Sequence, residues 1–187
     1  MSPRFVILHG WQNRRPADHW EHWLHDELVA AGHDVDYPQL PDPDEPDLDT
    51  WLEILDGLVT GGDREVTLIA HSLATSLWLT RVGRGGSAGL VTRLALVAIP
   101  APAGLAPTVV APFVQHPARI DTLPGGETII FDGEDDPYAP GGVRGDYEVD
   151  PTIPVELVPA GGHLIPDSGF GPWPRIREWA TAAKLGS

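Results

Sequence analysis

Residues 66–75 read VTLIAHSLAT, an apolar run of β-strand type that ends in a turn of the form small-x-Ser-x-small. This pattern is typical of a sharp strand-to-helix turn that exposes a serine hydroxyl above the end of a sheet. The positions two before and two after the serine must be small, because the two backbones nearly touch there, and Ala70 and Ala74 meet that need. We therefore interpret Ser72 as a candidate nucleophile. The alternative is an ordinary helix N-cap, whose hydroxyl accepts a hydrogen bond from a backbone N–H.

A candidate acid follows the serine along the chain. Residues 127–131 (ETIIF) predict a buried strand, and the polar loop DGEDDPYAP follows it at residues 132–140. Hydrolases with a serine on this kind of turn carry their acid after a later strand and their histidine near the C-terminus. Asp132, Asp135 and Asp136 are the candidates in this loop.

The candidate base is His163. Residues 155–158 (VELV) predict another apolar strand, and the glycines of PAGGHL at 159–164 let the chain turn tightly and bring the imidazole back over the sheet. His9, His71 and His116 are rivals for the same role. His71 adjoins Ser72, so its side chain is expected to project away from the hydroxyl. The three motifs occur in the order that such hydrolases require.

The rest of the chain alternates between predicted strands and helices. Strands are predicted at 4–8, 34–37, 66–70, 94–99, 121–131 and 155–158, and helices at 20–31, 47–59, 72–82 and 173–184. Near-continuous apolar strands between helices predict a three-layer α/β fold with a mostly parallel sheet covered on both faces. With 187 residues, the chain fits a single domain spanning 1–187. Active sites in such sheets lie beyond the carboxyl ends of the strands.

The charge balance narrows the classes of partner. The chain has 12 Lys and Arg against 27 Asp and Glu, a formal net charge of −15. Such a surface repels phosphate backbones and anionic lipids, so we expect no nucleic-acid and no membrane partner. The absence of cysteine excludes disulfides, thiolate metal sites and cysteine nucleophiles. No signal peptide and no membrane-spanning run are recognised, which predicts a cytoplasmic location.

Two groups of residues invite a metal interpretation that we do not favour. The acidic stretch 42–49 lacks the ligand spacing of a calcium loop and is interrupted by prolines, which favours a solvated loop. His19, His22 and His25 recur every three residues, but no third ligand clearly converges with them, so a partly exposed helix face is expected instead. We predict no metal and no cofactor.

Several motifs of the chain together resemble those of a known protein family. The residues that carry it are ILHGW (7–11), HW (19–20), AHSLA (70–74), GEDDPYAP (133–140), GGH (161–163) and SGFGPWP (168–174). With these motifs the chain resembles, over essentially its whole length, the small serine α/β-hydrolases of the retinoblastoma-binding protein nine or YdeN-like family. The resemblance implies a triad of Ser72, Asp136 and His163, with Asp136 as the acid because the family's acid directly precedes a proline.

The chain departs from that family pattern in two places. Ala70 and Ala74 replace the glycines that usually flank the serine. Similar proteins tend to place a helix after the acid loop, whereas residues 141–146 (GGVRGD) form helices poorly. We therefore expect that helix to be absent or very short.

Donors for a developing oxyanion are expected on both sides of the serine. The backbone N–H of Leu73, at the start of the helix, is one candidate. The other is expected from the loop after the first strand, at Trp11 or Gln12. His9, Gly10 and His71 are expected to line the substrate pocket. Trp11 also borders it, whereas packing roles are expected for Trp20, Trp23, Trp51, Trp78, Trp173 and Trp179.

These motifs together predict a serine hydrolase that cleaves small acyl esters through an acyl-enzyme intermediate. Two alternatives stay open: a protein-binding module on a hydrolase fold, and a cofactor-free perhydrolase or lyase that uses the same triad. Residues 100–120, rich in Pro and Ala, are interpreted as a minimal lid over the substrate entrance or as a plain surface loop.

Overall fold

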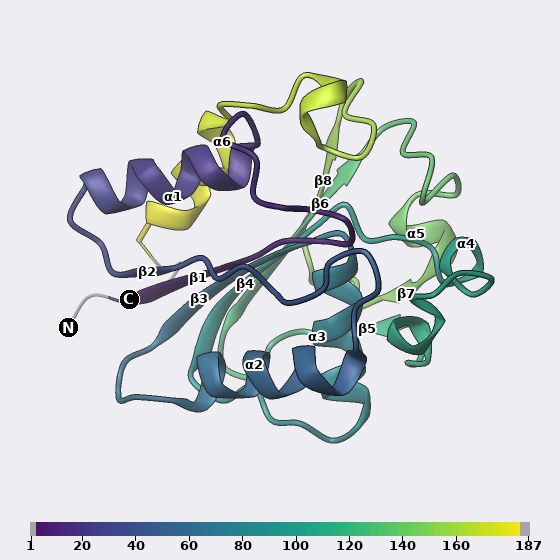
Figure 1. Cartoon of the computed structure of the whole chain (residues 1–187), viewed down its shortest axis with the longest axis horizontal. Helices are drawn as coiled ribbons and strands as arrows, with labels where there is room; N and C mark the ends of the chain where they lie inside the picture. Colours follow the sequence, from purple (N-terminus) through teal and green to yellow (C-terminus); the bar gives the residue numbers. More distant parts are fainter. Residues whose placement is uncertain (1–2, 184–187) are drawn as a thin grey trace.

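Six parallel strands form the central sheet of the computed structural model, which describes residues 3–183 (Figure 1). They run in the order β2-β1-β3-β4-β6-β8. Their bounds are β1 Arg4–Leu8, β2 Val35–Asp36, β3 Val66–His71, β4 Val91–Val97, β6 Glu127–Gly133 and β8 Val155–Val158. Strand β3 is buried along its whole length, as expected for a strand covered on both faces. The predicted parallel sheet is confirmed.

Helices cover both faces of the sheet, which confirms the predicted three layers. Helices α1 (Trp20–Ala30) and α6 (Pro174–Thr181) lie on one face, and α2 (Leu48–Thr60) and α3 (Leu73–Gly83) on the other (Figure 1). Each face buries its own apolar core. Helix α2 begins where the sequence predicts, because the Asp47 side chain accepts a hydrogen bond from the Thr50 N–H at 2.8 Å. Within residues 3–183 no helix combines the length and apolar character needed to cross a membrane.

The chain order creates a crevice at the carboxyl ends of β1 and β3. From β1 the chain crosses through α1 to β2 on one side, and from β2 it crosses through α2 to β3 on the other side of β1. The loops that leave β1 and β3 therefore diverge, and ligands of open α/β sheets bind where such a reversal occurs. Residues 9–19 and the turn at Ser72 border this point.

Residues 100–120 are more ordered than the sequence predicts. They contain the short helix α4 (Pro102–Leu105), the 3₁₀ helix η1 (Ala111–Val114) and strand β5 (Arg119–Ile120). Phe113 is fully buried, and its ring centroid lies 5.4 Å from that of Trp51 on α2. Thr80 Oγ1 on α3 donates to the Phe113 carbonyl at 2.8 Å. The stretch is therefore not a plain surface loop, because buried Phe113 packs it against two helices.

Several element boundaries also differ from the predicted ones. Strand β4 begins at Val91, which pairs with Val66, and ends before Ala98, where the chain turns with a φ of 51°. Strand β6 begins only at Glu127, because a turn with Gly125 at a φ of 69° precedes it. Strand β2 covers only residues 35–36 of the predicted 34–37. Helix α6 ends at Thr181, and Lys184 of the predicted helix lies outside the described residues.

The region after the acid loop is short, as expected. Helix α5 (Val143–Asp146) is a single turn. It leads into β7 (Glu148–Val149), which pairs with β5 in a two-stranded parallel sheet that the sequence did not indicate. These elements lie beyond the carboxyl ends of the main strands (Figure 1).

Candidate active site

Three side chains from distant parts of the chain meet at the carboxyl ends of the strands. Nε2 of His163 lies 2.8 Å from Oγ of Ser72, and Nδ1 of His163 lies 2.8 Å from Oδ2 of Asp136. A carboxylate only accepts hydrogen bonds, so the His163 hydrogen sits on Nδ1 and Nε2 is free to accept from the serine hydroxyl. His163 and Asp136 are both buried. The imidazole thus bridges an alcohol and a carboxylate.

The backbone around Ser72 forces its hydroxyl outward. Ser72 connects β3 to α3 with φ 52° and ψ −123°, a conformation that non-glycine residues rarely adopt. The Ser72 N–H donates to the Val97 carbonyl at 2.9 Å, and the Ser72 carbonyl accepts from the Thr75 N–H at 2.8 Å. The side chain makes no capping hydrogen bond to the helix. Ser72 therefore does not act as an ordinary N-cap.

Gly10 allows the loop after β1 to lie against the serine. A Cβ atom at Gly10 would stand 2.6 Å from the Cβ of Ser72 and 3.0 Å from its Oγ. Real Cβ atoms do not approach that closely, so only glycine fits this position without movement of the serine.

The loops that carry Asp136 and His163 are in backbone contact and joined by a hydrogen bond. A Cβ at Gly133 would lie 1.9 Å from the Gly162 carbonyl oxygen, so the two backbones touch. The Gly162 N–H donates to the Glu134 carbonyl at 2.8 Å. Oδ1 of Asp136 accepts from the Tyr138 N–H at 2.8 Å. This bond leaves Oδ2 of Asp136 to face His163.

The other two aspartates of the loop face elsewhere. Oδ2 of Asp132 accepts from the Val143 N–H at 2.9 Å at the start of α5, and burial raises the pKa of Asp132. Asp135 is exposed and has a positive φ of 60°. Asp136 is the member of the three that lies beside His163.

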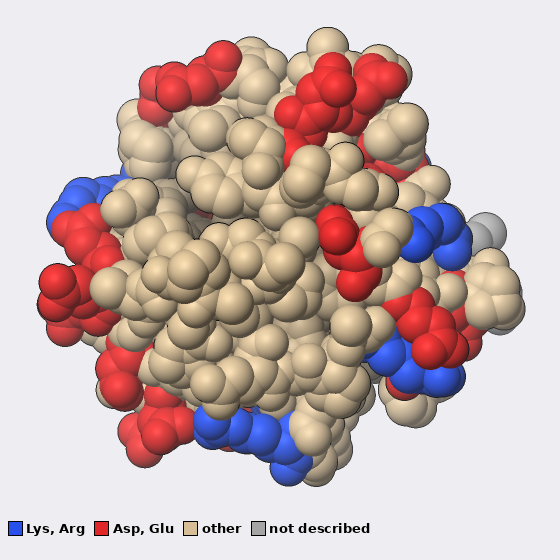
Figure 2. Space-filling view, turned by 90° about the vertical axis from the view of Figure 1, so that its right-hand side faces the viewer, with Lys and Arg blue, Asp and Glu red and all other residues tan. Residues whose placement is uncertain are grey.

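A cavity of about 510 Å³ opens beside the serine. Its wall includes Gly10, Trp11, Gln12, His71, Ser72, Leu73, Leu105, Tyr138, His163 and Ile165. Uncharged residues cover most of the centre of this face, and charged side chains of both signs, mostly Asp and Glu, lie around its margin (Figure 2). Of residues 100–120, Pro100 and Leu105 reach the cavity wall. The stretch therefore borders the cavity only at its first part.

His9 does not line the cavity, contrary to the expectation from the sequence. It is fully buried behind the wall, where its Nε2 accepts from the Leu40 N–H at 2.9 Å. Burial lowers the pKa of His9, so it stays neutral. Gly10 next to it does reach the cavity, because neighbouring side-chain positions on an extended chain point in opposite directions. His116 is outside the cavity wall and stacks on Tyr147.

The expected oxyanion donors differ in whether their N–H groups already donate a hydrogen bond within the protein. Leu73 is the first residue of α3, so its N–H has no acceptor within the helix. The Gln12 N–H donates to the Pro43 carbonyl at 2.8 Å. Trp11 lines the cavity, and its indole Nε1 donates to the Asp44 carbonyl at 2.9 Å.

Tyr138 is a cavity residue that the sequence analysis missed. Its ring centroid lies 4.5 Å from that of His163. Its position two residues after Asp136 is the signal that could have identified it, since that spacing keeps it in the acid loop.

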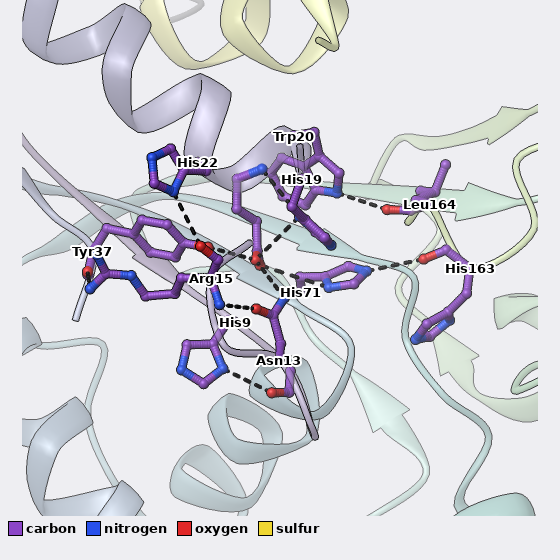
Figure 3. Close-up of polar contacts among 12 residues, drawn as sticks. His9, Asn13, Arg15, His19, Trp20, His22, Tyr37, His71, His163 and Leu164 are labelled. Atoms are coloured by element: carbon purple, nitrogen blue, oxygen red, sulfur yellow. Dashed lines mark hydrogen bonds and ion pairs between the residues drawn. The ribbon is translucent and has the colours of Figure 1, made fainter. Parts of the chain in front are cut away.

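A buried polar cluster behind His163 was also missed. Glu21 on α1 is fully buried, and burial raises its pKa to about 8. The spacing of Glu21, Leu24 and Leu28 places the carboxyl on the buried face of the helix, which is the signal that could have revealed it. Figure 3 shows the cluster, with His19, Tyr37 and His71 around the start of α1.

His19 does not lie on the exposed helix face that the sequence predicts for it. It is buried as the N-cap residue of α1, where its Nδ1 accepts from the Glu21 N–H at 3.3 Å, and burial lowers its pKa to about 4. His22 and His25 are partly exposed, as expected. The N-cap position turns His19 inward, so the three histidines do not share a face.

His19, Glu21 and His71 are the one group within residues 3–183 whose His, Asp or Glu ligand atoms lie close enough to hold a metal ion, within 4.8 Å of one another. Two of these side chains already accept hydrogen bonds, His19 from a backbone N–H and Glu21 from Tyr37 and Asn13. We assign no metal to the cluster. The acidic stretch 42–49 forms no such group, and its Asp47 caps α2.

Comparisons with known proteins agree on fold and family. The family model described as serine hydrolase matches residues 5–181. The YdeN protein of Bacillus subtilis is 33% identical over 73 residues, a stretch that spans 39% of this chain and 38% of that protein. The crystal structure of the same gene product superposes with a TM-score of 0.68 at 21% identity and covers 96% of this chain and 97% of that one. Mouse alpha/beta hydrolase domain-containing protein 10 gives 0.60 at 17% identity, with 87% and 82% covered. The fold is an α/β-hydrolase fold.

Proposed function

Because the chain belongs to the serine hydrolase family, we propose that it cleaves small acyl esters with Ser72 as nucleophile, His163 as base and Asp136 as acid. The observation that carries the proposal is the pair of 2.8 Å contacts that link the three side chains through His163. Such an arrangement activates an otherwise weakly nucleophilic hydroxyl.

The proposed reaction proceeds in two halves. Nε2 of His163 takes the Ser72 proton as Oγ attacks the acyl carbonyl, and then returns that proton to the departing alcohol. Water then attacks the acyl-enzyme, and Nε2 of His163 takes the proton of that water. The same proton returns to Oγ of Ser72 as the acid product leaves. Asp136 holds the Nδ1–H of His163 and stabilises the imidazolium that forms in each half.

The proposed oxyanion donors are the backbone N–H groups of Leu73 and Trp11. Leu73 directly follows the nucleophile at the start of α3, where the helix dipole also favours negative charge. Of the two residues expected from the loop after β1, Trp11 is favoured because the Gln12 N–H already donates to Pro43. Removing one such donor typically costs about a hundred- to a thousandfold in turnover.

The cavity supports an uncharged small-molecule acyl substrate. Its volume of about 510 Å³ suits a small ligand, and Trp11, Leu105 and Ile165 give it an apolar wall. Arg14, Asp18 and Asp167 also lie on the wall, and Arg14 is paired with Asp44. The two aspartates and the net charge of −15 therefore disfavour an anionic substrate. No nucleic-acid or membrane partner is proposed.

Labelling by a fluorophosphonate probe tests this proposal. The probe reacts with activated serines, so we expect covalent modification of Ser72 in the native protein and none after heat denaturation, with the site identified by peptide mass spectrometry. A native protein that stays unlabelled while hydrolysing no p-nitrophenyl ester would instead favour a protein-binding module on a hydrolase fold.

Replacing Gly10 with alanine is expected to lower kcat/KM for p-nitrophenyl acetate by about a hundredfold. The new Cβ would stand 2.6 Å from the Ser72 Cβ, so the nucleophile or the loop after β1 must move. Gly57→Ala on α2 is the matched control, since a Cβ there meets nothing within 4 Å. Equal activity of the two variants would contradict the proposed tight contact at the nucleophile.

A further inference from the structure

A fully buried glutamate lies behind the loop that carries His163. Oε2 of Glu21 accepts hydrogen bonds from Tyr37 Oη and Asn13 Nδ2, each at 3.0 Å. Oε1 of Glu21 faces Nδ1 of His71 at 3.7 Å. Within residues 3–183 neither of these two facing atoms has a hydrogen-bond partner. Buried polar atoms without a partner are rare, so this pair requires an explanation.

The other ring nitrogen of His71, Nε2, contacts the backbone of His163, the proposed base. Nε2 of His71 lies 3.0 Å from the His163 carbonyl oxygen. A carbonyl only accepts, so the His71 hydrogen sits on Nε2 and a lone pair remains on Nδ1. Nε1 of Trp20 donates to the next carbonyl, that of Leu164, at 2.8 Å. Figure 3 shows both bonds, which run from Trp20 and His71 to Leu164 and His163.

Burial favours the neutral form of Glu21 and outweighs the hydrogen bonds from Tyr37 and Asn13 and the charge of Arg15, which favour the ionised form. The titratable and charged groups that face the cluster are Arg15 from the loop after β1, Asp18 and His19 at the start of α1, Tyr37 after β2, His71 on β3 and, beyond them, His9 and His163. The Arg15 guanidinium is held by the Tyr37 carbonyl at 2.6 Å and lies over the Tyr37 ring, so it does not pair with Glu21.

An ion pair between Glu21 and His71 is disfavoured. It would place a cation on the His71 ring, whose centroid lies 5.2 Å from that of His163, the ring that must itself take up a proton. Burial raises the pKa of Glu21 to about 8 and holds the pKa of His71 well below its ordinary value. Both groups are therefore neutral at pH 7.

We propose that Glu21 is a positioning residue for His163: its neutral carboxyl donates to Nδ1 of His71 and thereby keeps the His71 hydrogen on Nε2, where it holds the His163 carbonyl. This inference rests on the proposed role of His163 as base. A movement of about 0.7 Å brings Oε1 and Nδ1 into hydrogen-bond range.

Loss of the Glu21 proton would undo this arrangement. The proton leaves to solvent, and the carboxylate then attracts the His71 hydrogen from Nε2 to Nδ1, so His71 stays neutral as the other tautomer. Nε2 now turns a lone pair toward the His163 carbonyl oxygen, and the hydrogen bond is replaced by repulsion. His163 loses one of its supports.

Glu21→Gln tests the proposal, with Glu27→Gln as the matched control. The glutamine oxygen accepts from Tyr37 and Asn13, and its NH₂ donates to His71 at every pH. Glu27 lies on the same helix but is partly exposed and faces Arg177. The measurement is kcat/KM for p-nitrophenyl acetate, together with the rate of Ser72 labelling by a fluorophosphonate, as a function of pH.

We expect wild type and Glu27→Gln to lose about tenfold to a hundredfold in both rates above about pH 8, and Glu21→Gln to show no such loss. An alkaline loss of the same size in Glu21→Gln would overturn the inference. So would a stoichiometric metal ion in the native protein that disappears in Glu21→Gln, because a metal requires the ionised carboxylate. If wild-type Ser72 is not labelled at any pH, the proposed function itself fails, which is a distinguishable result.

Thermal unfolding gives a second, independent measurement. The folded protein binds the Glu21 proton more tightly than the unfolded chain, so the free energy of unfolding falls as pH rises from about 4.5 to about 8. His9, His19, His71 and His116 have lowered pKa values, so their contribution rises with pH and is complete only about one pH unit above the unfolded histidine pKa of about 6.5. These histidines contribute equally to both proteins, so from about pH 4.5 to about 8 we expect the free energy of unfolding of wild type to fall relative to that of Glu21→Gln with the slope of one proton. Parallel curves for the two proteins would contradict a neutral Glu21.

Discussion

Replacing Ser72 with alanine is expected to lower kcat/KM for p-nitrophenyl acetate by on the order of a millionfold. The change removes the only atom that is proposed to form the acyl bond, and His163 keeps its place through Asp136 at 2.8 Å. Without the hydroxyl, the residual rate comes from the cavity and the oxyanion donors acting on water. Steady-state hydrolysis measures the loss, and fluorophosphonate labelling should vanish with it.

The fold should survive this substitution. The Ser72 side chain makes no capping hydrogen bond to α3, so its loss leaves no helix N–H newly unpaired. Ser76→Ala is the matched control, because Ser76 lies one turn later on the same helix and its buried hydroxyl has no hydrogen-bond partner in the described part of the chain. Ser76→Ala should retain full activity. Ester hydrolysis that persists in a folded Ser72→Ala protein would refute the nucleophile assignment.

Replacing Asp136 with asparagine is expected to lower kcat by about ten-thousandfold. The reason lies in the second contact of this side chain, since Oδ1 of Asp136 accepts from the Tyr138 N–H at 2.8 Å. The oxygen of an asparagine would take that donor, and its NH₂ would face Nδ1 of His163. His163 must then carry its hydrogen on Nε2, where it cannot accept the Ser72 proton.

Asp135→Asn is the control for this prediction. Asp135 is the adjacent residue, but it is exposed, and neither hydrogen bond of the His163 ring involves it. We expect its substitution to leave kcat within about twofold of wild type, as is usual for exposed positions away from a site. A larger loss for Asp135→Asn than for Asp136→Asn would move the acid to the neighbouring position.

Most of the fold could be predicted because its signals are local. Strands β1 and β8 have the predicted bounds, 4–8 and 155–158, and α2 begins directly after the aspartate that caps it. The stretch 100–120 could not be predicted, because Phe113 is ordered by Trp51, a side chain from a distant helix. The composition of a loop indicates only its local conformational preferences, and it does not predict packing partners that come from distant parts of the chain.

In the candidate site, too, some features follow from neighbouring residues and others from residues distant in the chain. The turn at Ser72 is visible in ten consecutive residues, but His163 is 91 residues from Ser72 and 27 from Asp136. The choice among three aspartates depended on a family resemblance. His9 was expected on the cavity wall and lies behind it, bound to the Leu40 N–H, because a partner far along the chain satisfies its ring.

The sequence by itself determined the alternation of strands and helices, the small residues at the serine turn, and the order of the candidate triad, since each depends on sterics and hydrophobicity over a few neighbouring residues. Only the tertiary structure decided which aspartate reaches His163 and that Glu21 is fully enclosed. Hydrogen-bond partners and the removal of water come from residues distant in the chain, and it is the removal of water that changes a carboxylate into a neutral acid.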